Sequence, residues 1–205
     1  MAILNRSSQV ANWATCVLSC FCRPGHFQSS FPIVGSYLVS EQVNIAVNVM
    51  QRSVNATANW LFQMALKVAN LRGLSPEYLI KKREIIENGL FVWLAERTLE
   101  GISIEVFDSS REDAHERFDF YFTYHSSPDP NVREPNIARL EEFCRTLEAL
   151  PPGMEYRVVV SIGPNASEVP GWYDYEFRPL VGAREERLSD HGFGHISTHL
   201  IYRGR

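Results

Sequence analysis

The chain has 205 residues, which is enough for one medium-sized domain with a tail or for two small domains. Its formal net charge of −4 and its pI near 5.9 disfavour a nucleic-acid-binding surface, because such a surface needs clustered excess Lys and Arg. No stretch has the ~18 consecutive apolar residues of a membrane span. Four cysteines do not form a disulfide framework in a chain of this length, so we expect a reducing, cytoplasmic setting.

Residues 1–36 carry few charges and show no helical or strand period, so we expect a flexible or loosely packed N-terminal segment. Their apolar part, VANWATCVLSCFC, is a weak candidate for a signal peptide because a single charge precedes it. Met50 is a later possible initiator, which leaves open where the folded protein starts. Four residues have a spacing that could suit a metal, but the paired Cys-x2-Cys of a zinc knuckle is missing: Cys16, Cys20, Cys22 and His26.

Two segments precede the centre of the chain. Residues 42–49, QVNIAVNV, alternate with a period of two and contain poor helix formers, so they predict a strand; a helix from Ser40 is the alternative. Residues 56–71 have apolar positions at helical spacing and predict a helix, with Asn55 or Thr57 as its cap. Gly73 suits the end of this helix.

Residues 75–124 have the clearest pattern in the chain. Ser75 and Pro76 are suited to the start of a helix, whose apolar stripe continues to Leu94. Residues 102–106 alternate between apolar and polar side chains and predict a half-buried strand. A charged loop, SSREDAHE, follows, and residues 118–124 alternate aromatic and polar side chains as a second strand.

The rest of the chain predicts one helix and three strands. A loop rich in Pro, Asp and Asn leads to a helix over residues 137–150, which contains Cys144 and ends at PPGM. Residues 156–162, YRVVVSI, are almost continuously apolar and predict a strand inside the sheet. Residues 172–180 predict an aromatic strand, and a polar connection then leads to a final strand over residues 195–202.

We find no pattern that indicates catalysis. The chain has neither a Gly-rich phosphate loop nor a GxSxG elbow. His191, His195 and His199 would share one face of a helix, but glycines interrupt them and the local pattern favours a strand. On a strand, each four-residue step separates them by about 13 Å, too far for one ion. We therefore expect no metal, no cofactor and no enzyme, and keep a metal protein or enzyme built on His191–His199 as the less favoured alternative.

The order of elements in residues 75–124 resembles the centre of a HORMA domain. The residues that carry the resemblance are the Trp-Leu turn, the ISIEVF strand, the charged hairpin and the RFDFYFTY strand, within roughly residues 53–205. The resemblance implies an α+β fold with three helices packed on a mostly antiparallel sheet and a C-terminal β "safety belt". It divides residues 37–205 into a core, 37–162, and a belt, 163–205.

Aromatic residues of the belt have two interpretations. A strand with aromatic side chains on both faces can pack on the core, or it can trap a peptide that adds to the sheet as a strand. The resemblance implies a short closure-motif peptide held under the belt. The residues expected in the peptide-binding belt are Trp172, Tyr173, Tyr175, Phe177, Ile196, Leu200 and Tyr202.

Among HORMA proteins, this short chain looks most like the bacterial members of CBASS anti-phage signalling. That resemblance implies a non-catalytic adaptor that binds a peptide and then activates a nucleotidyltransferase. It also implies remodelling by a ring-shaped AAA+ ATPase, allows a second HORMA protein as a partner, and involves neither nucleic acid nor membrane. A eukaryotic-type checkpoint or repair adaptor is the alternative within the same fold.

Overall fold

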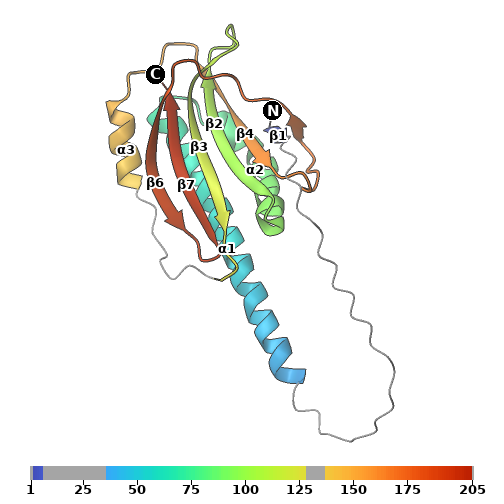
Figure 1. Ribbon diagram of the computed structural model, residues 1–205. Coiled ribbons are helices and arrows are strands. Elements are labelled where there is room, and N and C mark those ends of the chain that lie inside the picture. Colours follow the sequence, from blue (N-terminus) through green and yellow to red (C-terminus); the bar gives the residue numbers. More distant parts are fainter. Residues whose placement is uncertain (1, 7–35, 128–136, 205) are drawn as a thin grey trace, which may run out of the picture.

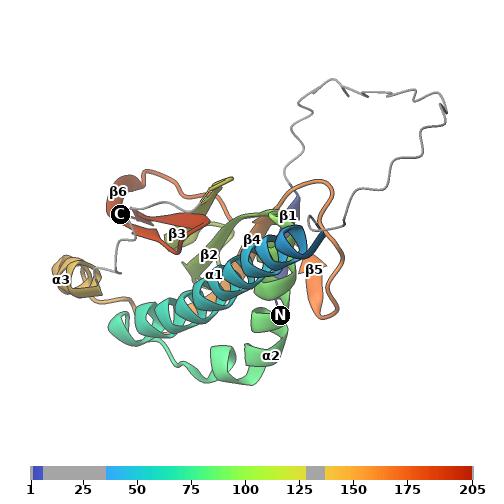
Figure 2. The same ribbon diagram turned by 90° about the horizontal axis from the view of Figure 1, so that it is seen from below.

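The computed structural model describes residues 2–6, 36–127 and 137–204. In this part of the chain, seven strands form one sheet in the order β5-β1-β4-β2-β3-β7-β6, accompanied by three helices. Helices α1 and α2 cover one face of the sheet, and α3 lies beside the β6 edge (Figures 1 and 2). The elements are β1 (Ala2–Arg6), α1 (Ser36–Leu71), α2 (Glu77–Glu96), β2 (Leu99–Phe107), β3 (Ala114–Tyr124), α3 (Ile137–Thr146), β4 (Glu155–Ile162), β5 (Trp172–Asp174), β6 (Arg184–Gly192) and β7 (Ile196–Gly204).

Helix α1 is much longer than the sequence predicts. Residues 42–49, predicted as a strand, lie inside it, so that prediction is wrong and the helical alternative is right. A period-two pattern over eight residues is a weak signal, and adding residues to an existing helix needs no new nucleation. Asn55 and Thr57, predicted as caps, are also interior, and the Thr57 hydroxyl donates to the Ser53 carbonyl at 2.8 Å.

Helix α2 follows the prediction closely. Gly73, at φ +69°, ends the turn after α1, and Pro76 immediately precedes the first helical residue of α2. The predicted apolar stripe of α2 is buried against the sheet and α1, with each side chain at most 1% exposed: Leu79, Ile86, Leu90, Trp93 and Leu94. The stripe supplies much of the core, since each such side chain contributes about 1.5–3 kcal/mol when buried.

Strands β2 and β3 form the predicted hairpin, with antiparallel register from Gly101 opposite Tyr121 to Phe107 opposite Ala114. Strand β3 begins earlier than expected, so the connecting loop is shorter than SSREDAHE. The side chains of Phe118 and Phe120 are fully buried beneath the helices. Alternation therefore gives the sheet an apolar face under α1 and α2 and a polar outer face.

Strand β4 lies inside the sheet, between β1 and β2, as its apolar run predicts. Val158, Val159 and Val160 are completely buried. Helix α3 confirms the predicted third helix but stops at Thr146. Its Cys144 is buried, and this burial raises the pKa of the thiol to about 11.

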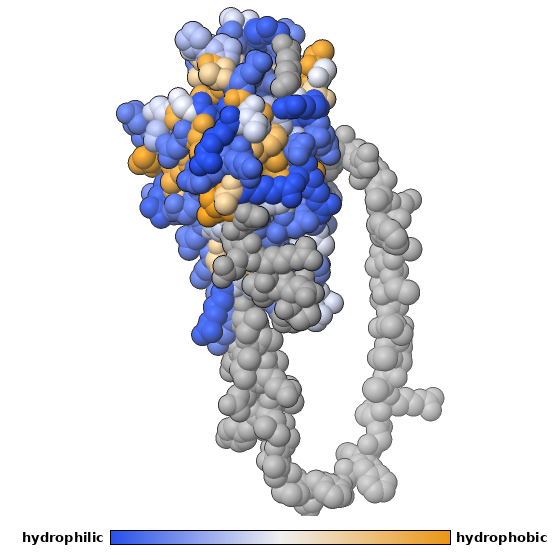
Figure 3. Space-filling model, turned by 90° about the vertical axis from the view of Figure 1, so that its left-hand side faces the viewer, coloured by the Kyte–Doolittle hydropathy of each residue, from blue (hydrophilic) through white to orange (hydrophobic). Residues whose placement is uncertain are grey.

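The C-terminal strands differ from the prediction in their bounds. Strand β5 covers only three of the residues predicted as strand 172–180, whereas β7 confirms the final strand. Strand β6 falls in the segment predicted as a polar connection. Its first four residues are exposed, because β6 is an edge strand and edges carry charge that discourages further pairing. The side of the molecule with α3 and β6 accordingly mixes polar and apolar areas (Figure 3).

The N-terminal end of the chain corrects a further prediction. Residues 2–6, expected to be flexible or loosely packed, form a strand between β4 and β5. Both of its pairings are parallel, whereas the other strand pairs of the described sheet are antiparallel. The possible metal spacing Cys16–His26 and most of the loop before α3, residues 128–136, lie outside the described residues. None of the described helices is long and apolar enough to cross a membrane.

Candidate functional site

One edge region of the sheet is built from β4, β1 and β5, where β1 comes from the N-terminal end of the chain and lies between two strands that are close to each other in sequence. Strand β1 pairs with β4 from Ile3 opposite Val159 to Arg6 opposite Ile162. On its other side β1 pairs with β5, where Leu4 lies opposite Asp174. Strands β4 and β5 do not pair with each other, so β5 belongs to the sheet only through β1 (Figure 1).

Trp172 fixes β5 to helix α2. The indole is 6% exposed, donates from Nε1 to the Ile85 carbonyl at 3.0 Å, and packs edge-on against Trp93 at 5.1 Å between ring centroids. The helix makes room for it at Gly89, where an added Cβ would lie 2.5 Å from Trp172 Nε1. Gly is unfavourable inside a helix by roughly 1 kcal/mol relative to Ala. Gly89 is therefore explained by the docking of Trp172.

The segment that leads into β5 is held at the C-terminal end of α2. Trp93 Nε1 donates to the Ser167 carbonyl at 2.8 Å, and the Ser167 amide donates to Glu96 at 3.1 Å. Hydrogen bonds from the Ser167 hydroxyl and amide lower the pKa of Glu96. Gly171 adopts φ +90° against the Ile85 side chain, a backbone conformation that favours glycine. Residues 163–171 are thus fixed by a few specific contacts.

After β5, the chain crosses the polar outer face of the sheet. The Glu176 carbonyl accepts from the Arg157 guanidinium of β4 at 2.9 Å, and the Arg178 amide donates to Glu105 of β2 at 2.9 Å. Strand β5 lies beyond β1, whereas Arg157 and Glu105 lie on the other side of it, so the chain after β5 returns from one side of β1 to the other. Strand β1 is flanked by β4 and β5, and the contact of Glu176 with Arg157 joins its two sides.

The crossing ends at the start of β3. The Ala114 amide donates to the Pro179 carbonyl at 2.9 Å, and the Arg117 guanidinium lies 4.4 Å from the centre of the Phe177 ring. Arg178 stacks in the same way on Phe107, at 4.1 Å. Each cation–π contact or hydrogen bond contributes about 0.5–2 kcal/mol. The segment after β5 is therefore attached to the sheet by several individually weak contacts.

Beneath the crossing lies a group of buried charges on the outer face. Glu105 is completely buried and accepts from Arg157 Nε at 2.5 Å. Asp119 is 1% exposed and pairs with Arg117 at 2.9 Å and with Arg203 of β7. Buried charges need such partners, since an unpaired one costs several kcal/mol. We call the cluster of Glu105, Arg117, Asp119, Arg157 and Arg203 the outer-face charge cluster.

The structure separates the seven residues that the sequence predicts for the belt. Trp172 is the buried anchor, whereas Tyr173 and Tyr175 are 53% and 44% exposed. Phe177 lies on the crossing, under Arg117. The other three are buried on β7 at the opposite end of the sheet from β1, in the core rather than against the β4 edge: Ile196, Leu200 and Tyr202.

The outer-face charge cluster was missed by sequence reasoning, although a signal exists. Strands β2 and β4 carry charges on the polar face, as Glu105 between Ile104 and Val106 and Arg157 before Val158 show. Alternation alone predicts that these side chains face away from the core. It does not predict that another segment buries them, because that depends on long-range packing.

The histidines of the metal hypothesis do not converge. His191 lies on β6 with its ring 4.8 Å from that of Trp60, whereas His199 lies on β7 and bonds Asp190 at 2.8 Å. His195, in the turn between these strands, approaches the His125 carbonyl at 3.3 Å. Within the described ranges, no group of three or more His, Cys, Asp or Glu residues is placed to hold a metal ion.

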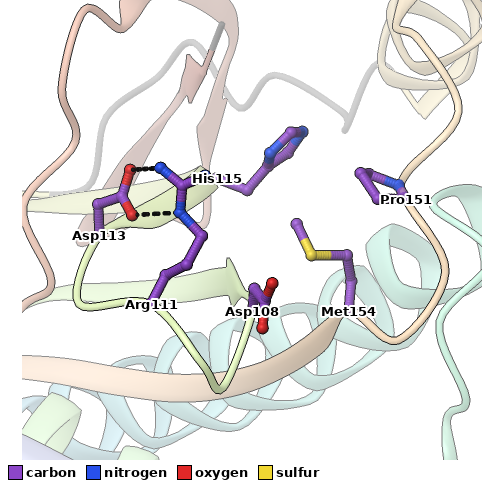
Figure 4. Close-up of a pocket in the computed structure, with 6 residues that line it drawn as sticks. All are labelled: Asp108, Arg111, Asp113, His115, Pro151 and Met154. Carbon is purple, nitrogen blue, oxygen red and sulfur yellow. Dashed lines mark hydrogen bonds and ion pairs between the residues drawn. The ribbon is translucent and has the colours of Figure 1, made fainter.

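A hollow lined mainly by charged residues lies beside the turn of the β2–β3 hairpin (Figure 4). Its volume is about 90 Å³, well below the roughly 300–1,000 Å³ of sites for drug-sized ligands. The charged group at its rim is already paired, because Arg111 donates to both Asp113 oxygens at 2.8 and 2.9 Å. This hollow is therefore a poor candidate for the binding site of such a ligand.

The same fold occurs in solved HORMA proteins. The chain matches a chain of a mitotic checkpoint complex with a TM-score of 0.64 and 14% identity, over 75% of this chain and 98% of that one. It matches *C. elegans* HTP-2 bound to the HIM-3 closure motif with a TM-score of 0.58 and 14% identity, over 74% and 91%. The fold is thus that of a HORMA-type α+β domain.

A family model narrows the class. The model described as bacterial HORMA domain 2 matches residues 42–189, so the chain belongs to this family. A chain in the *E. coli* MS115-1 HORMA:CdnC:Trip13 complex is also similar, with a TM-score of 0.52 and 11% identity over 89% of this chain and 98% of that one. No curated protein matches. The resemblance found in the sequence is confirmed.

Proposed function

We propose that this protein is a peptide-gated signalling adaptor. A short extended peptide adds to β4 as a strand, and residues 163–183, which we call the crossing belt, close over it. The observation that carries the proposal is the slot between β4 and β5, which has the width of one strand and is crossed by the chain that follows Asp174. Strand addition obtains affinity from backbone hydrogen bonds and specificity from alternate side chains.

The contacts of the crossing belt suit a segment that opens and closes. It is held by two buried side chains, Val169 and Trp172, and by polar contacts to Glu96, Glu105 and Arg157. A peptide shifts the balance between open and closed forms only by its difference in affinity for the two. A peptide under a closed belt leaves after the belt opens, so slow dissociation is the expected signature.

The partners follow from the family. The *E. coli* complex joins a HORMA protein to CdnC and Trip13, and these fit the roles of an activated nucleotidyltransferase and a remodelling AAA+ ATPase. We propose that the closed form of this chain binds and activates a CD-NTase-type nucleotidyltransferase in anti-phage defence, and that the ATPase reopens the belt. A second HORMA protein could supply the peptide.

The binding step is tested with a peptide selected from a display library on the full chain. Trp172→Ala should speed dissociation of the labelled peptide by roughly 30-fold, the scale of losing a buried aromatic anchor. Val181→Ala, at a position 64% exposed, is the matched control and should change little. Equal dissociation from both variants would contradict a role for the crossing belt in holding the peptide.

The signalling step is tested with a purified nucleotidyltransferase of the CdnC kind. Synthesis of cyclic oligonucleotide should rise when the peptide-bound protein is added and should rise less with the Trp172→Ala variant. A nucleotidyltransferase equally active with and without the protein would remove activation from the proposal while leaving peptide binding intact.

A further inference from the structure

The slot that the proposed function assigns to a peptide is filled by the chain's own N-terminal end. Ala2–Arg6 pairs with β4 on one side and with β5 on the other. We propose that Ala2–Arg6 is a built-in ligand, which occupies the peptide site of its own molecule and holds the crossing belt closed until another peptide displaces it. This inference rests on the proposed function and adds the identity of the resident occupant.

The sheet topology makes the closed belt depend on an occupant. Strands β4 and β5 have no direct pairing, so β1 satisfies the backbone groups that each presents to the slot. Without a strand there, those amides and carbonyls of Val159–Ile162 and Trp172–Asp174 that face the slot would lose their partners, while the groups of β4 that face β2 would keep theirs. Unpaired backbone groups away from water cost about as much as a lost hydrogen bond. An empty slot therefore favours release of β5.

The occupant has the features of a peptide ligand rather than of an integral strand. It has five residues, and both of its pairings are parallel in an otherwise antiparallel described sheet. Its sequence, AILNR, combines an apolar run with a polar and basic end, a composition suited to an extended segment at a sheet edge. A competitor of the same chemistry, a short extended peptide with an apolar centre, would fit the same slot.

Strand β1 belongs to the same chain as the slot that it occupies, with residues 7–35 between it and α1. An added peptide therefore competes with an intramolecular ligand, whose effective concentration is set by its connection to the domain. Only molecules with a vacant slot can bind an added peptide. The apparent Kd for that peptide therefore equals the intrinsic Kd divided by the fraction of vacant molecules.

Cysteine cross-linking tests the placement in the full-length protein. Leu4→Cys and Asp174→Cys stand opposite each other across β1 and β5. Neighbouring strands are about 4.8 Å apart, within the range of disulfide Cα separations. The background carries Cys16→Ser, Cys20→Ser and Cys22→Ser, and Leu4→Cys with Val181→Cys is the mismatched control.

Oxidation should give a disulfide-linked monomer for the matched pair and little product for the control. A disulfide-linked dimer would overturn the proposal, because the strand would then come from a second copy. Absence of any cross-link, or equal cross-linking in the control, would overturn it as well.

A proline variant tests the dependence of the belt on its occupant. Leu4→Pro removes an N–H inside a strand that is paired on both sides. Amide exchange in Val159–Ile162 and Trp172–Asp174 should become about tenfold faster. Ala2→Pro, at the first residue of the strand, is the matched control and should have a smaller effect. Unchanged exchange with Leu4→Pro would contradict the proposal.

The two proposals fail in distinguishable ways. If the cross-link does not form but a selected peptide protects Val159–Ile162, the resident strand is wrong and peptide capture stands. If the intramolecular cross-link forms but no selected peptide binds even to the Leu4→Pro variant, the resident strand stands and the adaptor function falls. If both hold, the Leu4→Pro variant should bind the selected peptide more tightly than the unmodified chain.

Discussion

The two edges of the sheet are built in different ways. At one edge, β7 pairs with β3 over nine residues, and β6 pairs with β7 outside it. Alternate side chains of β7, including Leu200 and Tyr202, lie in the core. At the other edge, β5 has three residues, one neighbouring strand and one buried side chain, Trp172. Both edges belong to the region expected from the sequence to act as one belt.

This difference indicates which part of the molecule moves. Burial of apolar surface contributes much of the free energy of folding, and the β6–β7 hairpin buries apolar side chains along its length. The crossing belt, residues 163–183, has only two buried apolar side chains, Val169 and Trp172, and polar contacts that can form again after opening. Segments that open in proteins come from the less stable end of the structure. We therefore assign the switch to the crossing belt and regard the hairpin as part of the fixed domain.

The largest expected effect separates the core from the crossing belt. Phe118→Ala removes a completely buried side chain of β3 and should lower the free energy of unfolding by about 3–5 kcal/mol. Tyr173→Ala, at a β5 position 53% exposed, should stay within about 0.5 kcal/mol. Denaturant unfolding measures both. Comparable losses would mean that β5 is as much a part of the core as β3.

The next effect concerns the outer-face charge cluster. Glu105→Ala leaves Arg157 and the Arg178 amide without their acceptor, and we expect a loss of about 1–3 kcal/mol together with faster exchange of residues 175–179. Glu185→Ala removes an exposed partner of Arg203 and should cost well under 1 kcal/mol. Unchanged exchange in the Glu105→Ala variant would show that the cluster does not hold the crossing.

Gly89→Ala tests the anchor. A Cβ at this position would lie 2.5 Å from Trp172 Nε1 and 2.8 Å from the buried ring of Trp93, so both indoles would have to shift, whereas alanine itself favours the helix by roughly 1 kcal/mol. Exchange of Trp172–Asp174 should rise about tenfold, equivalent to about 1.4 kcal/mol. The neighbouring, exposed Asn88→Ala is the control. If Gly89→Ala leaves exchange in β5 unaltered, Trp172 is not the anchor.

The smallest effect depends on pH. The pKa of Glu96 is lower in the folded protein, so its contribution is present above its ordinary value of about 4.5 and is lost as pH falls through the lowered value. The NMR shift of the Ser167 amide should follow this titration, because that amide donates to the carboxylate. In a Glu96→Gln variant the titration should disappear. A Ser167 amide that does not respond to pH in the original chain would contradict this contact.

Local patterns in the sequence predicted most of the domain core. The α2 stripe from Leu79 to Leu94, the β2–β3 hairpin and the apolar run of β4 each repeat one period over enough residues to identify the element. The strand predicted at 42–49 failed because its short period-two pattern was weaker than the continuity of a long helix. Strand β6 was missed because an exposed edge strand has too few apolar residues to show alternation.

The site was only partly predictable. The selection of aromatic residues in the C-terminal region identified Trp172 and Phe177. It also included Tyr202, which packs against Phe118 in the core and is not part of the site. Pairing of β1 with β4 joins residues more than 150 positions apart, and no local pattern in Ala2–Arg6 indicates its partner. The outer-face charge cluster likewise depends on which segment crosses above it.

Hydrogen exchange across the unmodified chain tests the assignment of the switch most directly. The comparison is between the crossing belt, residues 163–183, the β6–β7 hairpin, residues 184–204, and the β2–β3 hairpin, residues 99–124. The account predicts that the crossing belt exchanges fastest of the three and that the two hairpins are similarly protected. A crossing belt as protected as the β2–β3 hairpin, or a β6–β7 hairpin that exchanges together with the belt, would contradict it.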